Sequence, residues 1–163
     1  VLWRMNSKRY MPAKIKYLRS QGIQFHGLPK YISDTVNIDG TDYSLIAIGT
    51  DSVISSEVRL LTHDYSIMRA AAAVGAPIDG VVRVVKPISI GNNCFIGTRS
   101  ILMPGTSIGD NVIVGAGSVV NGKVESNAVI AGNPARKVRT IEDHHRIVTT
   151  RDADAIRVER DTI

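Results

Sequence analysis

The side chains best suited to acid–base chemistry in this sequence are its four histidines, because an unperturbed imidazole has a pKa of about 6.5. These are His26, His63, His144 and His145. His63 has a distinctive place, since it is the third residue after Leu60, where a regular series of aliphatic residues stops and a long irregular segment begins. Asp64 follows directly and could orient the ring, contact a substrate or close a turn. We therefore take His63 as the candidate general base and Asp64 as its candidate catalytic companion.

The elements that must position these side chains are set by a repeat of six residues in the second half of the chain. Aliphatic residues recur at this spacing without a gap: Val84, Ile90, Ile96, Leu102, Ile108, Val114 and Val120. The residue four positions after the aliphatic is small or β-branched: Cys94, Ser100, Thr106, Val112, Ser118 and Val124. Glycine often follows the aliphatic directly, as at Gly97 and Gly115. This regularity indicates a structural repeat.

The same phase extends upstream through three more aliphatic residues: Ile48, Ile54 and Leu60. Ile32 and Ile38 form an earlier pair that is offset by four residues. A period of six fits neither a helix nor simple alternation, but it fits one short strand followed by one tight corner. Coils of this kind pair their strands in parallel around a narrow aliphatic core. We therefore predict an all-β hexapeptide-repeat solenoid with the segment 64–83 ejected as a loop.

Both ends of such a solenoid need caps, because no coil can cover its own open face. The segment Pro12–Ser20 begins with proline and stops before a glycine, which predicts a short helix. Thr140 is a suitable N-cap for a second helix that runs to about residue 149. The sequence thus predicts three regions: an N-terminal basic helical cap over 1–31, the solenoid over 32–135, and a C-terminal helix and tail over 136–163.

Positive charge is concentrated at the N-terminal end of a chain whose net charge is +5 and whose pI is about 9.6. Seven basic residues precede the first acid, Asp34: Arg4, Lys8, Arg9, Lys14, Lys16, Arg19 and Lys30. A segment of this kind attracts phosphates and is suited to peripheral contact with an anionic membrane. The aromatic residues do not form a stacking platform and no nucleic-acid module is recognisable, so we expect no nucleic-acid partner.

The single cysteine, Cys94, excludes an intramolecular disulfide and a cysteine-rich zinc site. It occupies one of the small positions of the repeat, so we interpret it as a core residue. No apolar run approaches the roughly 20 residues that span a bilayer, and no secretory signal is visible. We therefore expect a cytoplasmic protein. The chain begins with Val1 rather than Met, and the sequence leaves open whether residues precede it.

The run IGNNCFIGTRSILMPGTSIGDNVIVGAGSVV and the later NAVIAGNPARKVR closely resemble the hexapeptide-repeat acyltransferases, in particular those that acetylate sugars of surface polysaccharides. The resemblance covers roughly residues 32–141 and includes the LLTHD segment before the loop. It implies a left-handed parallel β-helix and a homotrimer with active sites between neighbouring subunits. It also implies acetyl-CoA as cosubstrate, a sugar acceptor and no metal.

The resemblance further implies roles for individual residues. His63 corresponds to the family's general base, which takes the proton from the acceptor so that the acceptor attacks the thioester directly. The small residues of two coils would let the backbone approach pantetheine: Gly97, Thr98, Gly115 and Ala116. The cations after the AGNPA turn resemble the family's contacts to the nucleotide phosphates: Arg136, Lys137 and Arg139.

Three further residues are candidates for the acceptor site. Arg69 lies in the ejected loop, which in the family lines the acceptor site, and its guanidinium suits a phosphate or an acidic sugar. Phe95 matches a position that is often aromatic in sugar acetyltransferases. Asp34 could face His63 from an earlier coil, although the four-residue offset leaves Ser33 and Asn37 open as well.

Two other functions remain open for this sequence. One is N-acyl transfer to an aminosugar nucleotide, which uses the same donor and the same base. The other is a trimeric β-helix scaffold without catalytic activity. A γ-class carbonic anhydrase shares the fold but needs three zinc-binding histidines, and His63 is the only histidine between residues 27 and 143. The sequence does not identify the sugar, the hydroxyl or amine, or the acyl chain.

Overall fold

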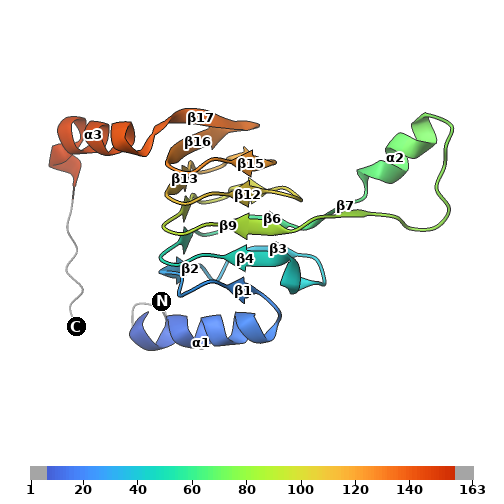
Figure 1. Ribbon diagram of the computed structural model, residues 1–163, viewed down its shortest axis with the longest axis horizontal. Helices are drawn as coiled ribbons and strands as arrows, with labels where there is room; N and C mark the ends of the chain where they lie inside the picture. The colour runs from blue at the N-terminus through green and yellow to red at the C-terminus, as the bar shows by residue number, and fades with distance from the viewer. Residues whose placement is uncertain (1–6, 157–163) are drawn as a thin grey trace.

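The computed structural model describes residues 7–156 and shows a stack of coils with a helix at each end and an arm at one side (Figure 1). The first parallel sheet has five strands: β1 (Gln24–Phe25), β4 (Ile46–Ile48), β9 (Ile88–Ile90), β12 (Ser107–Ile108) and β15 (Lys123–Val124). The second has six: β2 (Tyr31–Ile32), β5 (Val53–Ile54), β10 (Phe95–Ile96), β13 (Val112–Val114), β16 (Ala128–Gly132) and β17 (Ala135–Thr140). The third has four: β3 (Asn37–Asp39), β6 (Arg59–Leu61), β11 (Ile101–Leu102) and β14 (Val119–Val120).

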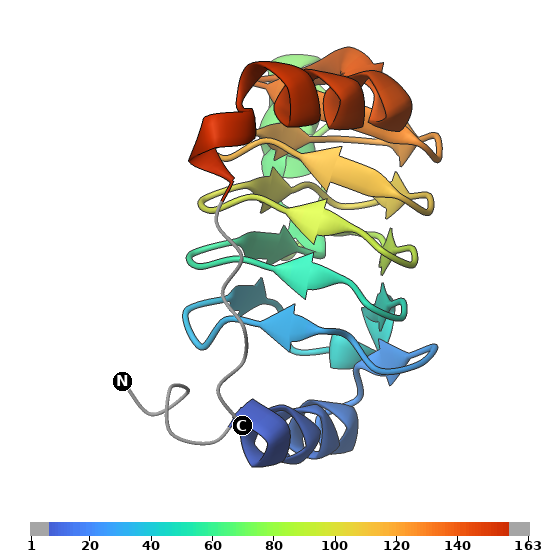
Figure 2. The ribbon, with the colours of Figure 1, turned by 90° about the vertical axis from the view of Figure 1, so that its left-hand side faces the viewer.

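The first four coils pass in turn through the first, second and third sheets, and the last coil ends in the second sheet. Consecutive coils lie one above the other (Figure 2). All strand pairs in these sheets are parallel except β16 with β17. The turns between second-sheet and third-sheet strands form what we call the second corner: residues 33–36, 55–58, 97–100 and 115–118. The connections from the third sheet back to the first form the third corner: residues 40–45, 62–87, 103–106 and 121–122. This arrangement fits the parallel β-helix that the repeat predicts.

The register explains both the repeat and its early offset. Phe95 pairs with Ile113, 18 residues later, so three hexapeptides make one coil. Ile38 pairs with Leu60, 22 residues later, because a longer connection that contains the 3-10 turn Tyr43–Leu45 follows β3. The four extra residues of this coil are the offset seen in the sequence.

The core is the inward row of the repeat. Its members are buried almost completely: Ile48, Ile54, Leu60, Ile90, Ile96, Leu102, Ile108, Val114 and Val120. The small positions, among them Cys94, Ser100 and Ser118, are also buried. The sequence interpretation of Val84 as the first member of the unbroken series is wrong, because its side chain is 37% exposed and lies outside the coils. Its spacing matches the repeat, but its strand belongs to the arm.

Two helices lie at the ends of the stack. The first, α1 (Ser7–Ser20), starts five residues before the predicted Pro12 and contains that proline. Burial of Met11 together with Ile15, one helical turn apart, favours the longer helix. The second, α3 (Ile141–Arg151), begins as predicted after Thr140, whose side chain accepts a hydrogen bond from the Asp143 amide at 3.1 Å. A short 3-10 turn, Ala153–Ala155, follows it.

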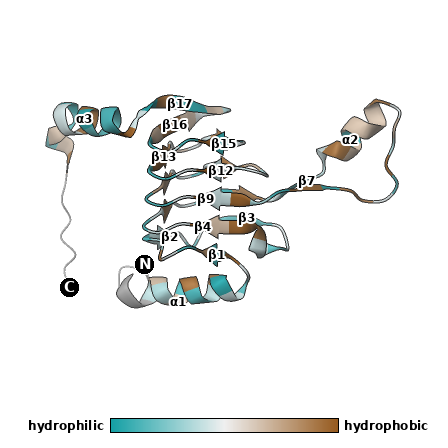
Figure 3. Ribbon diagram, in the orientation of Figure 1, coloured by the Kyte–Doolittle hydropathy of each residue, from teal (hydrophilic) through white to brown (hydrophobic). Residues whose placement is uncertain are grey.

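The arm leaves the stack at the third corner and projects to the side opposite α3 (Figure 1). Its base is an antiparallel pair, β7 (His63–Asp64) with β8 (Val84–Val85), and its outer part contains α2 (Ser66–Ala73). Much of the arm is hydrophobic (Figure 3), and several of its aliphatic side chains are exposed: Val74, Ile78, Val81, Val84 and Val85. The N-terminal part of the predicted basic cap (residues 1–6) and the end of the tail (157–163) lie outside the described residues.

Candidate active site

His63 is the first residue of the arm, at the third corner, where β7 starts directly after the coil. Its side chain is only 17% exposed, and its ring meets the edge of the Tyr65 ring with centroids 5.3 Å apart. Nε2 lies 4.0 Å from Asp39 Oδ2, too far for a direct hydrogen bond. Nδ1 is buried and has no hydrogen-bond partner among the described residues. Nε2 of His63 therefore faces the Asp39 carboxylate without a direct hydrogen bond between them.

The turn after β3 places Asp39 beside the imidazole. Thr62, the buried residue before His63, donates a hydrogen bond from Oγ1 to the Asp39 carbonyl at 3.0 Å. Gly40 has φ of +128°, and a Cβ at this position would lie 2.6 Å from Thr62 Oγ1. Only glycine allows this close approach without displacing its neighbour. These two contacts hold the first and second coils close together next to the candidate base.

Asp64 lies beside His63 in sequence but binds the start of the arm helix. Its carboxylate accepts hydrogen bonds from the Ser66 amide at 2.7 Å and from the Ser66 hydroxyl at 2.8 Å. These two bonds, the amide first, hold the pKa of Asp64 below its ordinary value. The geometry favours the turn-closing role for Asp64, and its catalytic role stays a prediction. The carboxylate that faces Nε2 is that of Asp39, which the repeat pattern did not single out, although it directly follows Ile38 of the earlier, offset aliphatic pair.

Asp34 is found at the N-terminal end of the stack and forms an ion pair with Lys14, whose Nζ lies 2.7 Å from Asp34 Oδ1. Lys14 also donates to the Ile32 carbonyl at 2.9 Å. The expected approach of Asp34 to His63 is therefore replaced by that of Asp39, five residues further along the same coil. The longer first coil explains the difference, because its offset could not be assigned to a particular turn from sequence.

The residues expected to bind the acetyl donor, acetyl-CoA, include four that form a continuous column on the second corner. The Gly97 amide donates to the Val114 carbonyl of the next coil at 2.9 Å, and the Gly117 amide donates to the Thr98 carbonyl at 2.8 Å. A Cβ on Gly97 would lie 2.5 Å from the Ala116 amide nitrogen. These glycines therefore bring consecutive coils into close contact. Thr98 and Ala116 are exposed along the column.

The column continues into the basic strand at the C-terminal end. A Cβ on Gly115 would lie 2.9 Å from that of Ala131, and Ala131 is paired with Arg136 across β16 and β17. Ile130 is likewise paired with Lys137. Both cations are exposed, and Arg139 is half-buried on the same strand. The structure thus places four of the predicted donor residues on the second corner (Gly97, Thr98, Gly115 and Ala116) and the other three on the adjoining strand β17 (Arg136, Lys137 and Arg139). Their role as a CoA site stays a prediction.

The two remaining acceptor candidates occupy different surfaces. Phe95 is 44% exposed on the outer face of the second sheet, two residues before Gly97. It lines a cavity of about 410 Å³ together with the corner asparagines Asn93 and Asn111. Arg69 is exposed on α2 in the arm. The structure of one chain does not bring Phe95, Arg69 and His63 into one pocket.

The candidate base and the donor column lie on different corners of the coil stack. The third sheet separates these corners, and its strand β6 alone contributes three residues, about 10 Å at 3.3 Å per residue. Across residues 7–156 there is no group of three His, Cys, Asp or Glu side chains that could hold a metal ion. In the same part of the chain no helix has the length and apolar character needed to cross a membrane.

Comparison with known proteins identifies the family. Residues 87–121 match the family model described as the hexapeptide repeat of succinyl-transferase. Protein CapG of Staphylococcus aureus is 40% identical over 125 residues, which cover 77% of this chain and 70% of CapG. WbbJ of Escherichia coli, described as a candidate lipopolysaccharide biosynthesis O-acetyl transferase, is 34% identical over 118 residues. The chain belongs to the hexapeptide-repeat acyltransferase family.

The match to WbbJ covers 67% of this chain and 59% of WbbJ, so the chain spans less than two thirds of that relative's length. Among solved structures, the hexapeptide-repeat acetyltransferase VCA0836 of Vibrio cholerae, complexed with acetyl coenzyme A, is similar with a TM-score of 0.56. That similarity covers 84% of this chain and 82% of VCA0836 at 24% sequence identity. It supports the fold of stacked parallel coils.

Proposed function

We propose that this protein transfers the acetyl group of acetyl-CoA to a hydroxyl group of a sugar in a surface polysaccharide or its precursor. The proposal includes a left-handed coil and a homotrimer whose active sites lie between subunits, as the resemblance implies. The observation that carries it is the column at the second corner, where small exposed residues lead to the exposed cations of β17. This order suits a long thiol cofactor with a narrow amide-containing arm and a phosphorylated nucleotide. The name of WbbJ supports a polysaccharide acceptor.

The proposed reaction uses His63 as general base. For Nε2 to accept a proton, the neutral imidazole must carry its hydrogen on the buried Nδ1. Nε2 takes the proton of the sugar hydroxyl while that oxygen attacks the thioester carbonyl carbon and forms the new ester bond. The tetrahedral intermediate then collapses, the carbon–sulfur bond breaks, and the CoA thiolate leaves and takes up a proton. Binding both substrates side by side makes the transfer effectively intramolecular, so no covalent enzyme intermediate is needed.

Asp39 is suited to assist this step. Its carboxylate lies 4.0 Å from the nitrogen that becomes protonated, so it stabilises the imidazolium formed during the attack. The Asp39 side chain is 50% exposed, so its carboxylate can also accept a hydrogen bond from a second hydroxyl of the sugar. We therefore include Asp39 in the proposed active site, next to His63.

A shared active site explains why base and donor column occupy different corners. The outer face of the second sheet carries an apolar row that the described residues leave partly exposed: Tyr31, Val53, Phe95 and Ile113. The corresponding outer rows of the other sheets contain polar residues, such as Ser89 and Ser107 or Asn37 and Arg59. We assign the apolar row and the exposed arm to contacts between subunits. In such a trimer, His63 of one subunit meets the donor column of its neighbour.

The direct test is thiol release from acetyl-CoA in the presence of free, nucleotide-linked and oligomeric sugars. We expect release that depends on the sugar, with a product whose mass and base lability identify an O-acetyl ester. His63→Ala should fold like the parent and lose a factor on the order of 10²–10⁴ in turnover. His145→Ala, on the exposed face of α3, is the matched control and should retain activity.

Near-parental turnover by folded His63→Ala would refute the assignment of the base. An alkali-stable amide product would instead establish N-acyl transfer to an aminosugar. If no sugar supports release and acetyl-CoA does not bind, the protein is a β-helix scaffold without this chemistry.

A further inference from the structure

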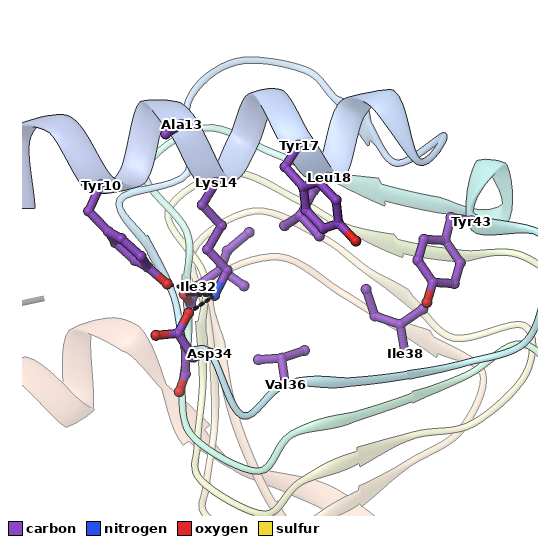
Figure 4. Close-up of a pocket in the computed structure, with 11 residues that line it drawn as sticks. Tyr10, Ala13, Lys14, Tyr17, Leu18, Ile32, Asp34, Val36, Ile38 and Tyr43 are labelled. Carbon is purple, nitrogen blue, oxygen red and sulfur yellow. Dashed lines mark hydrogen bonds and ion pairs between the residues drawn. The ribbon is translucent and has the colours of Figure 1, made fainter. Parts of the chain in front are cut away.

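A cavity of about 450 Å³ lies at the N-terminal end of the stack, between α1 and the first coil. Three tyrosines surround it: Tyr10 and Tyr17 from α1, and Tyr43 from the connection after β3 (Figure 4). Most of the remaining wall is aliphatic and includes Ile38. The volume is in the range of about 300–1,000 Å³ that is typical of small-ligand pockets. None of the proposed donor residues lines this cavity.

One end of the cavity carries a compact array of hydrogen-bonding groups. Lys14 Nζ lies 2.7 Å from Asp34 Oδ1 and 3.4 Å from Tyr10 Oη, and it lies 5.7 Å from the centre of the Tyr10 ring. The Lys14 side chain is 13% exposed, whereas that of Asp34 is 65% exposed. A cationic donor, an anionic acceptor and a phenol thus meet beside an aromatic and aliphatic wall. The array presents donors and acceptors within a few ångströms of one another.

The chemistry of this array selects one class of ligand. An anion at Lys14 would also meet the Asp34 carboxylate, which opposes phosphate and carboxylate ligands. An alkyl chain would contact the wall but would leave the polar end without new partners. Lys14 donates its three protons to Asp34, Tyr10 and the Ile32 carbonyl. Sugar hydroxyls both donate and accept, so they can donate to the exposed Asp34 carboxylate and accept from the Tyr10 phenol. The carbon–hydrogen face of a pyranose ring packs on tyrosine, which combines an apolar ring with a polar tip.

The cavity is connected through β3 to the proposed active site. Ile38 lines the cavity, and the next residue, Asp39, faces His63 on the other side of the strand. The end of the stack is also separate from the apolar row that we assign to subunit contacts. We propose that this cavity binds a neutral glycosyl unit of a multi-unit acceptor while another unit is acetylated, an inference that rests on the proposed function. The acceptor would then be an oligosaccharide or polysaccharide chain rather than a single free sugar.

Equilibrium binding to the full chain without acetyl-CoA tests this cavity independently of catalysis. The probes are glucose, galactose and N-acetylglucosamine, with maltose, lactose and chitobiose as their disaccharides, at up to about 20 mM. NMR of the tyrosine rings reports the site, and the experiment is done in the His63→Ala background. We expect at least one saccharide to shift the Tyr17 ring resonances. Tyr17 is 61% exposed, so Tyr17→Ala should fold normally and weaken this binding about tenfold.

Two matched variants complete the experiment. Tyr17→Phe keeps the ring and should retain binding, while Lys16→Ala, an exposed neighbour outside the cavity, should bind like the parent. Octanoate serves as the probe for an alkyl-chain ligand. The inference would be overturned if no saccharide shifts the Tyr17 resonances, or if octanoate alone shifts them. Saccharide binding at Tyr17 without any acetyl transfer would refute the proposed function alone. Acetyl transfer to sugars without any effect at Tyr17 would refute the cavity alone.

Discussion

At the scale of single residues, the proposed chemistry depends on the gap between His63 and Asp39. The backbone of Asp39 is held in place because its carbonyl accepts a hydrogen bond from the Thr62 hydroxyl and because Gly40, which follows it, packs against the same hydroxyl. A carboxylate 4.0 Å from Nε2 stabilises the positive charge that appears only when the imidazole takes a proton. Asp39 therefore acts on the rate of transfer, and any contact with a sugar hydroxyl adds an effect on acceptor binding.

We predict that Asp39→Asn lowers kcat for acetyl transfer about tenfold, with little change in the KM for acetyl-CoA. The amide keeps the size of the side chain but cannot stabilise an adjacent imidazolium. Steady-state kinetics with varied donor and varied acceptor measure both constants. Asp51→Asn is a suitable control, because Asp51 is exposed at another corner with φ of +56°, a conformation that asparagine tolerates. An unchanged kcat in Asp39→Asn would remove this residue from the active site.

Lys14 should make stability depend on pH. Burial lowers its pKa from the ordinary 10.5 to about 8, and Asp34 opposes this shift only weakly because water screens an exposed carboxylate. Between about pH 8 and 10.5 the unfolded chain keeps a proton that the folded chain has released. The free energy of unfolding therefore gains a contribution that rises with pH over this window.

Urea denaturation between pH 7.5 and 10 measures this contribution, because this range starts near the lowered pKa of Lys14 and extends toward its ordinary value. We predict that the parent gains stability over this range relative to Lys14→Met, which has no proton to release. Lys16→Met, at an exposed position of the same helix, should follow the parent. If both variants show the same pH dependence, Lys14 is not a desolvated lysine in solution.

At the scale of elements, the second corner depends on close contact between consecutive coils. Gly97 faces the backbone of Ala116 at a distance that leaves no room for a methyl group. We predict that Gly97→Ala lowers the free energy of unfolding by about 1–3 kcal/mol, because a backbone clash cannot be relieved by a side-chain rotation. Ala116→Ser, at an exposed position of the same corner, should be nearly neutral in the same urea titration.

The same substitution tests the donor column. A displaced corner should raise the KM for acetyl-CoA more than that for the acceptor, because the column is assigned to the donor. Asp51→Asn, at an exposed position outside the column, provides the comparison. If Gly97→Ala is as stable as the parent, the coils can separate easily at this corner. If the variant is destabilised but its KM for acetyl-CoA equals that of the parent, the column is not the CoA site.

At the scale of the whole molecule, the proposed active site is complete only when subunits meet. The apolar row on the second sheet and the hydrophobic arm are surfaces that a single chain leaves exposed to water. We predict a trimer by light scattering, and we predict that Ile113→Glu, in the apolar row, gives folded monomers without transferase activity. Ser107→Glu, in the polar outer row of the first sheet, should leave the trimer intact. A trimer that survives Ile113→Glu would place the subunit contact elsewhere.

The sequence by itself determined the stack of coils. A period of six places one aliphatic residue inward in each short strand, and this local pattern does not depend on contacts outside the repeat. Helix α3 was equally local, because a threonine N-cap and acidic first-turn residues suffice to start it. The residues that the resemblance assigns to the donor belong to the repeat and its terminal turn, so their stacking follows from the register, while their role in binding stays a prediction.

Only the tertiary structure decided where the non-repetitive residues lie. Val84 matches the period but pairs with Asp64 in the arm, and β17 adds to the second sheet through an antiparallel contact that no periodicity predicts. Asp39 rather than Asp34 faces His63, because a first coil with four extra residues can lengthen at any of its turns. The Lys14–Asp34 pair and its cavity likewise arise from the docking of α1 on that coil. Such contacts join residues whose separation along the chain follows no repeat, so their geometry is fixed by packing.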